Sequence, residues 1–157
     1  MEVMSTSTAF MVFLGLGAIS CSRIDVMGLR RDLGDISTRF SVDLKGPQCR
    51  MLGHTRTGYC ISDISKEAVA SLISGLNLSN LNGKADEINA SDVGSLEFDG
   101  GCRKEPPFMD ITKTEIHWIH NRPDSLRMNN GSAFQYLLLF QNQTTGEVCI
   151  QVSYSYG

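Results

Sequence analysis

In two stretches near the C-terminus apolar residues recur at every second position, and this spacing constrains the fold more than any other feature. In the first, apolar side chains recur at every second position from Phe134 to Phe140. In the second, the same spacing runs from Val148 to Tyr156. A period of two is typical of a β-strand with one buried face. The polar stretch Gln141–Gly146 between them predicts an antiparallel hairpin connection.

The places of these two strands in a sheet also follow from their side chains. Leu137 and Leu139 make the second face of the first strand apolar, so we expect that strand at the centre of the sheet. The last strand of the chain is expected at an edge. Further strands are expected at Arg39–Lys45 and Phe108–Asn121. A hairpin or disulfide-closed loop is expected at Cys49–Ile61. A short strand is also expected over Leu96–Phe98.

One amphipathic helix is expected over residues 63–75. Its apolar residues from Ile64 to Leu76 follow a helical spacing, and Asp63 or Ser65 is suited to cap its first turn. Residues 22–38 contain Gly28 and Gly34 and show no clear periodicity, which indicates a partly ordered lead-in. Together these elements predict an α+β fold, a mainly antiparallel sheet of about four to six strands with one packed helix.

The first twenty residues have the pattern of an export signal. Ala9–Ile19 is an unbroken apolar run that is too short to span a bilayer and fits the core of a secretory signal. We therefore expect residues 1–20 to be a signal peptide, residues 21–38 a tether and residues 39–157 a single domain. The alternative interpretation is a buried strand or helix of a cytosolic domain.

The segment Ala18-Ile19-Ser20-Cys21 resembles the lipobox of bacterial lipoproteins. The resemblance implies cleavage before Cys21 and acylation of its thiol, so that the chain has a membrane as its partner through a lipid anchor. It also implies a location at the bacterial outer membrane or its periplasmic face. The main alternative is a secreted protein without an anchor.

The cysteine count agrees with an exported chain. An odd number of cysteines leaves one thiol to explain, and Cys21 is that residue in the lipoprotein interpretation. The other four allow three pairings, of which we favour Cys49 with Cys60 and Cys102 with Cys149. The alternative is a set of buried free cysteines in a cytosolic domain.

Charge and motifs argue against several functions. The net charge of −3 and the lack of a basic run make nucleic-acid binding unexpected. No phosphate-binding or nucleophile motif occurs after residue 20, and no cofactor is expected. His117 and His120 would point to opposite faces of a strand with no cluster of ligands nearby, so no metal site is expected. We interpret them as lying at a solvated edge.

Two further features bear on function. Four Asn-x-Ser/Thr sites fall in expected loops and suit a eukaryotic secreted glycoprotein, at Asn77, Asn89, Asn130 and Asn142. Trp118, Tyr154 and Tyr156 are candidates for a binding surface, because tyrosine and tryptophan often anchor partners.

The sequence as a whole favours a cell-envelope protein with a non-catalytic binding, inhibitory or structural role. The alternative is a small secreted enzyme, hydrolase-like, with an unrecognised site. A cleft that holds His117 or His120 beside a carboxylate would favour the enzyme, and a continuous exposed aromatic patch would favour the binding protein.

Overall fold

The computed structural model of the chain describes residues 25–53, 56–81, 100–120 and 134–154. The predicted signal with Cys21, the expected short strand at Leu96–Phe98, and Tyr156 lie outside these ranges. The elements run in the order α1 (Val26–Phe40), β1 (Lys45–Met51), β2 (Thr57–Asp63), α2 (Lys66–Leu76), β3 (Ser79–Asn80), the 3-10 turns η1 (Gly101–Lys104), η2 (Pro106–Phe108) and η3 (Ile111–Lys113), then β4 (Thr114–His120), β5 (Phe134–Asn142) and β6 (Glu147–Tyr154).

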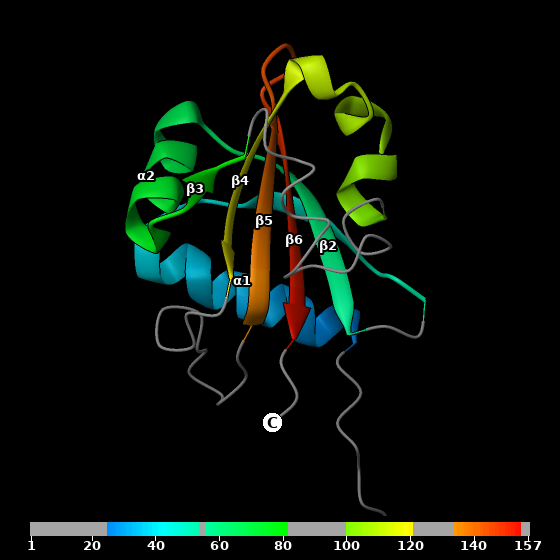
Figure 1. Ribbon diagram of the computed structural model, residues 1–157. Coiled ribbons are helices and arrows are strands. Elements are labelled where there is room, and N and C mark those ends of the chain that lie inside the picture. Colours follow the sequence, from blue (N-terminus) through cyan, green and yellow to red (C-terminus); the bar gives the residue numbers. More distant parts are fainter. Residues whose placement is uncertain (1–24, 54–55, 82–99, 121–133, 155–157) are drawn as a thin grey trace, which may run out of the picture.

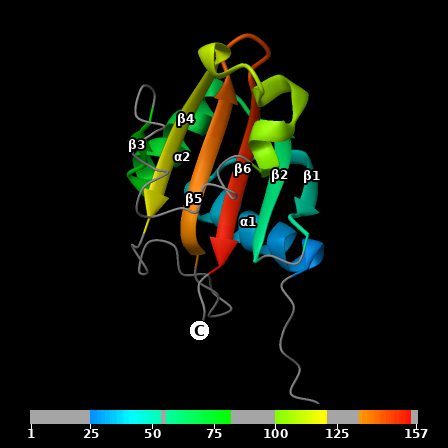
Figure 2. The same ribbon diagram turned by 45° about the vertical axis from the view of Figure 1, so that its right-hand side comes forward.

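The described strands form one antiparallel sheet in the order β1-β2-β6-β5-β4-β3 (Figures 1 and 2). This confirms the expected α+β fold and the central place of β5. The expectation that the last strand lies at an edge is wrong, because β6 pairs with β2 on one side and β5 on the other. Its polar residues Gln151 and Ser153 are buried, which the alternation alone does not reveal.

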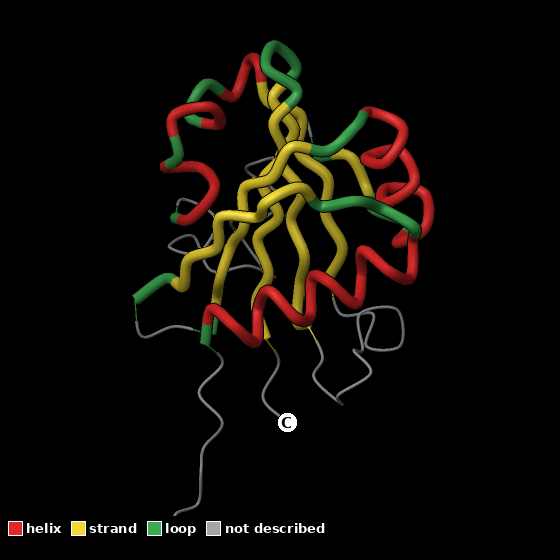
Figure 3. The backbone as a smooth tube through the Cα atoms, turned by 180° about the vertical axis from the view of Figure 1, so that it is seen from behind, coloured by secondary structure: helices red, strands yellow, loops and turns green. Residues whose placement is uncertain are grey.

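The two helices cover one face of the sheet, and α1 crosses the strands near their lower ends (Figure 3). The larger core lies between α1, α2 and this face, and it includes the predicted apolar face of β6 from Val148 to Tyr154. A second, smaller core lies on the opposite face, around Phe108, Leu138 and Phe140. The sheet is therefore the middle of three layers over part of its area.

Helix α1 corrects the prediction of a lead-in over residues 22–38. Asp25 caps the helix by accepting a hydrogen bond of 2.8 Å from the Gly28 amide. Leu29, Leu33 and Ile36 are almost fully buried against the sheet. The two glycines lower the helix propensity of this segment, and burial of its apolar face outweighs that cost.

The strand expected at Arg39–Lys45 is also wrong. Helix α1 continues to Phe40 and ends at Ser41, whose positive φ of 52° provides a left-handed cap. Strand β1 begins at Lys45 and includes Gly46 and Pro47, which the sequence placed after a strand. An irregular register between Lys45 and Gln48 accommodates the proline at this outer edge.

Three other local predictions have clear outcomes. The hairpin around residues 54–58 is confirmed by the antiparallel pairing of β1 and β2. Helix α2 is confirmed, and Ser65 caps it through a hydrogen bond from the Ala68 amide. Strand β4 begins at Thr114 rather than at Phe108, because the double proline at 106–107 starts the 3-10 turn η2, and a second turn, η3, follows before the strand.

Strand β5 contains an irregularity that the sequence pattern does not show. Phe134 was expected on the same face as Tyr136, Leu138 and Phe140. The register against β6 shifts between Phe134 and Tyr136, so Phe134 packs into the larger core instead. Its ring meets the ring of Tyr154 edge to face, with centroids 5.0 Å apart.

Gly75 of α2 is close to Phe40, the last residue of α1, and this contact predicts a stability effect. A Cβ atom at residue 75 would lie 2.4 Å from two carbons of the Phe40 ring. Gly75→Ala should therefore lower the free energy of unfolding by about 1–3 kcal/mol, since the ring has to move. Gly34→Ala is the matched control, because a Cβ there meets nothing within 4 Å. It should stabilise the protein by about 0.5–1 kcal/mol through helix propensity. Urea unfolding midpoints that shift in the same direction for both variants would contradict this.

Candidate functional site

Two disulfides lie on opposite faces of the sheet. Cys49 of β1 is bonded to Cys60, its direct neighbour on β2, with Cα atoms 4.1 Å apart. Cys102 of η1 is bonded to Cys149 of β6, with Cα atoms 5.8 Å apart. Both are the pairings favoured from the sequence. The first lies on the face covered by the helices, and the second lies in the smaller core.

The second disulfide holds a connector of 3-10 turns, Gly100–Lys113, over the smaller core. The Cys102 amide also donates a hydrogen bond of 3.1 Å to Oε1 of the buried Gln151 side chain. Further along, Phe108 is buried and the Asn142 side-chain amide donates to the Pro107 carbonyl oxygen. The connector is thus attached to strands β5 and β6 by covalent, polar and apolar contacts.

Gly101 permits this close approach. Its φ of +54° lies in the left-handed region that favours glycine. A Cβ atom at this position would lie 2.3 Å from the Gln151 Oε1 atom and 3.3 Å from Cδ1 of Tyr59. Any larger residue would push the connector away from β6.

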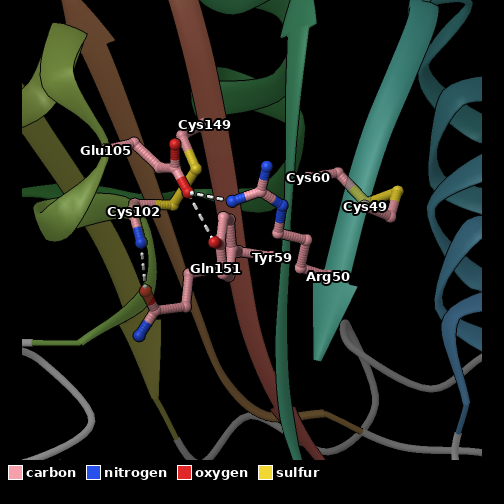
Figure 4. The surroundings of a disulfide bond; sticks show 8 residues. All are labelled: Cys49, Arg50, Tyr59, Cys60, Cys102, Glu105, Cys149 and Gln151. Carbon is pink, nitrogen blue, oxygen red and sulfur yellow. Dashed lines mark hydrogen bonds and ion pairs between the residues drawn. A yellow bond between two sulfur atoms is a disulfide. The ribbon is translucent and has the colours of Figure 1, made fainter. Parts of the chain in front are cut away.

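A polar cluster that we call the clasp (Arg50, Tyr59 and Glu105) fastens the connector to the β1–β2 hairpin. Tyr59 donates a hydrogen bond of 2.6 Å from its hydroxyl to Oε1 of Glu105. The Arg50 guanidinium donates to the same oxygen at 3.1 Å (Figure 4). The Arg50 side chain is 66% exposed and the Glu105 side chain 16%, so the clasp lies at the surface.

The electrostatics of the clasp favour a structural or binding role. Burial and the Glu105 carboxylate raise the pKa of Tyr59, and Arg50 offsets part of this effect. Tyr59 therefore stays protonated at neutral pH and acts as a hydrogen-bond donor. The neighbouring cysteines, Cys102 and Cys149, are both in a disulfide and cannot act as nucleophiles. The most exposed part of the clasp is the positively charged side chain of Arg50.

The sequence analysis did not single out the clasp, although part of it was predictable. Arg50 directly follows Cys49, and Tyr59 directly precedes Cys60. Arg50 and Tyr59 are cross-strand partners in the hairpin. Pairing Cys49 with Cys60 sets this register, so their contact follows from the disulfide. Nothing in the sequence links Glu105 to them, because the link depends on where the connector crosses the sheet.

His117 lies beside a carboxylate, as the enzyme alternative requires, but it is buried. Its Nε2 atom is 3.1 Å from Oε1 of Glu115, and its side chain is only 8% exposed. Glu115 accepts hydrogen bonds from the side-chain amides of Asn80 and Gln143. The interpretation of His117 as a solvated residue is therefore wrong. The side chain of His120 and the whole of His54 lie outside the described residues.

Of the expected aromatic binding surface, Trp118 and Tyr154 lie on opposite faces of the sheet, and Tyr156 is outside the described residues. Tyr154 is buried in the larger core, 2% exposed, where its hydroxyl donates a hydrogen bond to Asp32 of α1. Trp118 packs against the smaller core on the opposite face of the sheet. The two rings are separated by the sheet because the β4 and β6 side chains that carry them point in opposite directions.

The structure also places two of the four Asn-x-Ser/Thr sites. Asn142 is 5% exposed, and its Oδ1 atom accepts hydrogen bonds from the amides of Thr144 and Thr145. Its side chain is thus occupied in the β5–β6 turn and is poorly suited to carry a glycan. Asn77 is exposed and forms the C-cap of α2. Asn89 and Asn130 lie outside the described residues.

A polar hollow of about 380 Å³ lies between the start of β1 and the first turns of α2. Its charged lining residues are Asp43, Lys45 and Glu67. It lies apart from His117 and from the clasp, and its lining contains neither a histidine nor a cysteine. Among the described residues, no group of three or more His, Cys, Asp or Glu side chains is arranged to hold a metal ion.

Comparison with known protein families, with curated proteins and with solved structures found no match to this chain.

Proposed function

We propose that the chain is an exported protein, anchored to the cell envelope by a lipid on Cys21, whose folded part has a non-catalytic binding, inhibitory or structural role. The observation that carries this proposal is the pairing of the four cysteines after Cys21 in two disulfides. Structural disulfides persist outside the reducing cytosol. The pairing leaves Cys21, directly after the apolar signal-like segment, as the one cysteine that needs another role.

The contacts of the polar residues support a non-catalytic role over the enzyme alternative. The His117–Glu115 pair has the composition of an acid–base pair, but it is buried and lies apart from the hollow that the structure describes. The clasp offers an exposed arginine and a protonated tyrosine, which suit recognition of a partner rather than activation of a nucleophile. No helix in the described part of the chain is long and apolar enough to cross a membrane.

The test is the mass of the exported protein, measured intact and then after alkylation before and after reduction. We expect a chain that begins at a diacylated Cys21, with four cysteines that alkylate only after reduction. The matched control is Cys21→Ser, which should leave both disulfides intact and release the protein from the membrane fraction. A chain that begins at Met1 or Met4 with five free thiols would overturn both the export and the anchor.

A further inference from the structure

The outward side of α1 is basic, although the chain has a net charge of −3. Three of the exposed residues of this helix are arginines, and none is acidic. The exposed residues are Met27, Arg30, Arg31, Gly34, Thr38 and Arg39. Its two acidic residues are withdrawn from the surface, since Asp32 is buried and Asp35 is half-buried. The sequence contains no basic run, so the helix itself gathers these charges on one side.

Five of the exposed residues form one stripe along the helix, which we call the α1 stripe (Met27, Arg30, Arg31, Gly34 and Thr38). They are spaced by three or four positions, so they lie above one another on a helix. Met27 is 78% exposed, the largest fraction among the exposed large apolar residues of the described chain. The Arg31 side chain is 62% exposed. Basic residues beside an exposed apolar side chain suit contact with an anionic headgroup surface, which attracts them electrostatically.

The position of α1 brings this stripe close to the proposed anchor. Only residues 22–24 separate Cys21 from the cap residue Asp25. Even a fully extended connection of this length spans only about 14 Å. In Figure 3 the helix runs in front of the sheet, and no described element covers its outer side. A lipid on Cys21 would therefore hold the first turns of α1 beside the membrane surface.

We propose that the α1 stripe lies on an anionic phospholipid surface. This rests on the proposed function, because the anchor brings the stripe to the membrane and the stripe then sets the orientation. Helix α1 lies parallel to the membrane, and the opposite face of the sheet, with the clasp, is turned away towards partners. We favour a membrane over an acidic protein because the tether is so short.

The electrostatic free energies of two arginines are large enough to orient the protein on a membrane. A basic residue beside an anionic leaflet contributes about 1 kcal/mol, which corresponds to about a fivefold change in the docked population. Loss of Arg30 and Arg31 together should therefore reduce docking about 25-fold. This attraction falls off within about 10 Å at ordinary ionic strength, a distance comparable with the reach of the tether.

The experiment imposes the anchor chemically, so that it does not depend on what the cell does to Cys21. A chain of residues 21–157 contains every described residue of the fold. With both disulfides formed, its Cys21 thiol is coupled to a maleimide phospholipid in vesicles. The vesicles contain either phosphatidylcholine alone or phosphatidylcholine with phosphatidylglycerol. Hydrogen–deuterium exchange of peptides from α1 is then compared on the two surfaces and at low and high salt.

We expect slower exchange in α1 on the anionic vesicles only, with the difference lost at high salt. Arg30→Gln with Arg31→Gln should abolish the slowing. The control is Lys104→Gln with Lys113→Gln, which makes the same charge change at two exposed positions of the connector, across the sheet from α1, and should keep it. Equal urea midpoints establish that all the variants fold.

Two outcomes would overturn the inference. One is equal exchange of α1 on anionic and neutral vesicles, which would leave an acidic macromolecule as the partner of the stripe. The other is an equal loss of slowing in the control variant, which would show an effect of total charge alone. If Cys21 carries no lipid in the cell, the proposed function is overturned. The exchange result on vesicles does not depend on that finding.

Discussion

Replacing Cys102 and Cys149 by alanine should lower the free energy of unfolding by about 4 kcal/mol. This disulfide closes a loop with a sequence separation of 47 residues, and the chain-entropy estimate for such a loop is about 4 kcal/mol. The Cys49–Cys60 bond has a separation of 11, for which the same estimate is about 3 kcal/mol. Both cysteines of the longer loop are fully buried, so alanine also removes packing in the smaller core.

The matched control is Cys49→Ala with Cys60→Ala, compared in equilibrium guanidinium unfolding. The two pairs should also differ in where they loosen the structure. Loss of the Cys102–Cys149 bond should speed amide exchange in the connector. Its remaining ties are the Gln151 and Asn142 hydrogen bonds, the buried Phe108 ring and the clasp. A Cys102/Cys149 variant that is no less stable than the Cys49/Cys60 variant would contradict the estimate.

The second large effect is expected at Tyr154. Its hydroxyl donates a hydrogen bond of 3.0 Å to the buried carboxylate of Asp32, which joins α1 to the last strand. Tyr154→Phe removes this donor and should cost about 1.5–3 kcal/mol, the range for hydrogen bonds to charged groups. Asp32→Asn keeps an oxygen acceptor for the tyrosine and should cost less. Guanidinium midpoints measure both, and an unchanged midpoint for Tyr154→Phe would contradict the expected role.

Tyr154 also predicts how the stability of the protein changes at alkaline pH. Burial, followed by the charge and hydrogen bond of Asp32, raises the pKa of Tyr154 above the ordinary value of 10.0. Above about pH 10 the unfolded chain releases this proton and the folded chain retains it, so stability falls as the pH rises. Below that pH the contribution of Tyr154 to stability is fully present.

Tyr154→Phe should therefore flatten the loss of stability above about pH 10 relative to the native protein. Tyr59, whose pKa is also raised, is present in both chains and cancels in the comparison. Cys21 has to be alkylated beforehand, because a thiolate exchanges with disulfides at alkaline pH. Parallel curves of unfolding free energy against pH would show that Tyr154 is not the residue responsible.

The elements that were predicted correctly are those with a strong local pattern. Strand β6 and helix α2 have regular spacings of apolar residues, and the β1–β2 hairpin is closed by cysteines only 11 residues apart. Helix α1 was missed because Gly28 and Gly34 weaken its propensity. Its stability comes from the burial of Leu29, Leu33 and Ile36, whose spacing of four and three is itself a helical pattern that the two glycines obscured.

The candidate sites were less predictable than the fold. The contact between Arg50 and Tyr59 follows from the register of a disulfide-linked hairpin. Glu105 reaches them from the connector, across 46 residues of sequence from Tyr59. His117 is buried against the prediction, because a strand pattern does not show which of its faces a helix will cover. Trp118 and Tyr154 resemble one aromatic row in the sequence but lie on opposite faces of the sheet.

The residues alone thus determined the α+β class, the strands at the C-terminus, the second helix and the cysteine pairs, because each depends on spacing along the chain. Folding decided that the last strand is central, that α1 completes the larger core and that Asp32 meets Tyr154. It also decided that scattered arginines become one stripe on a helix. These features depend on contacts between segments far apart in sequence, whose free energy is gained only when the sheet brings them together.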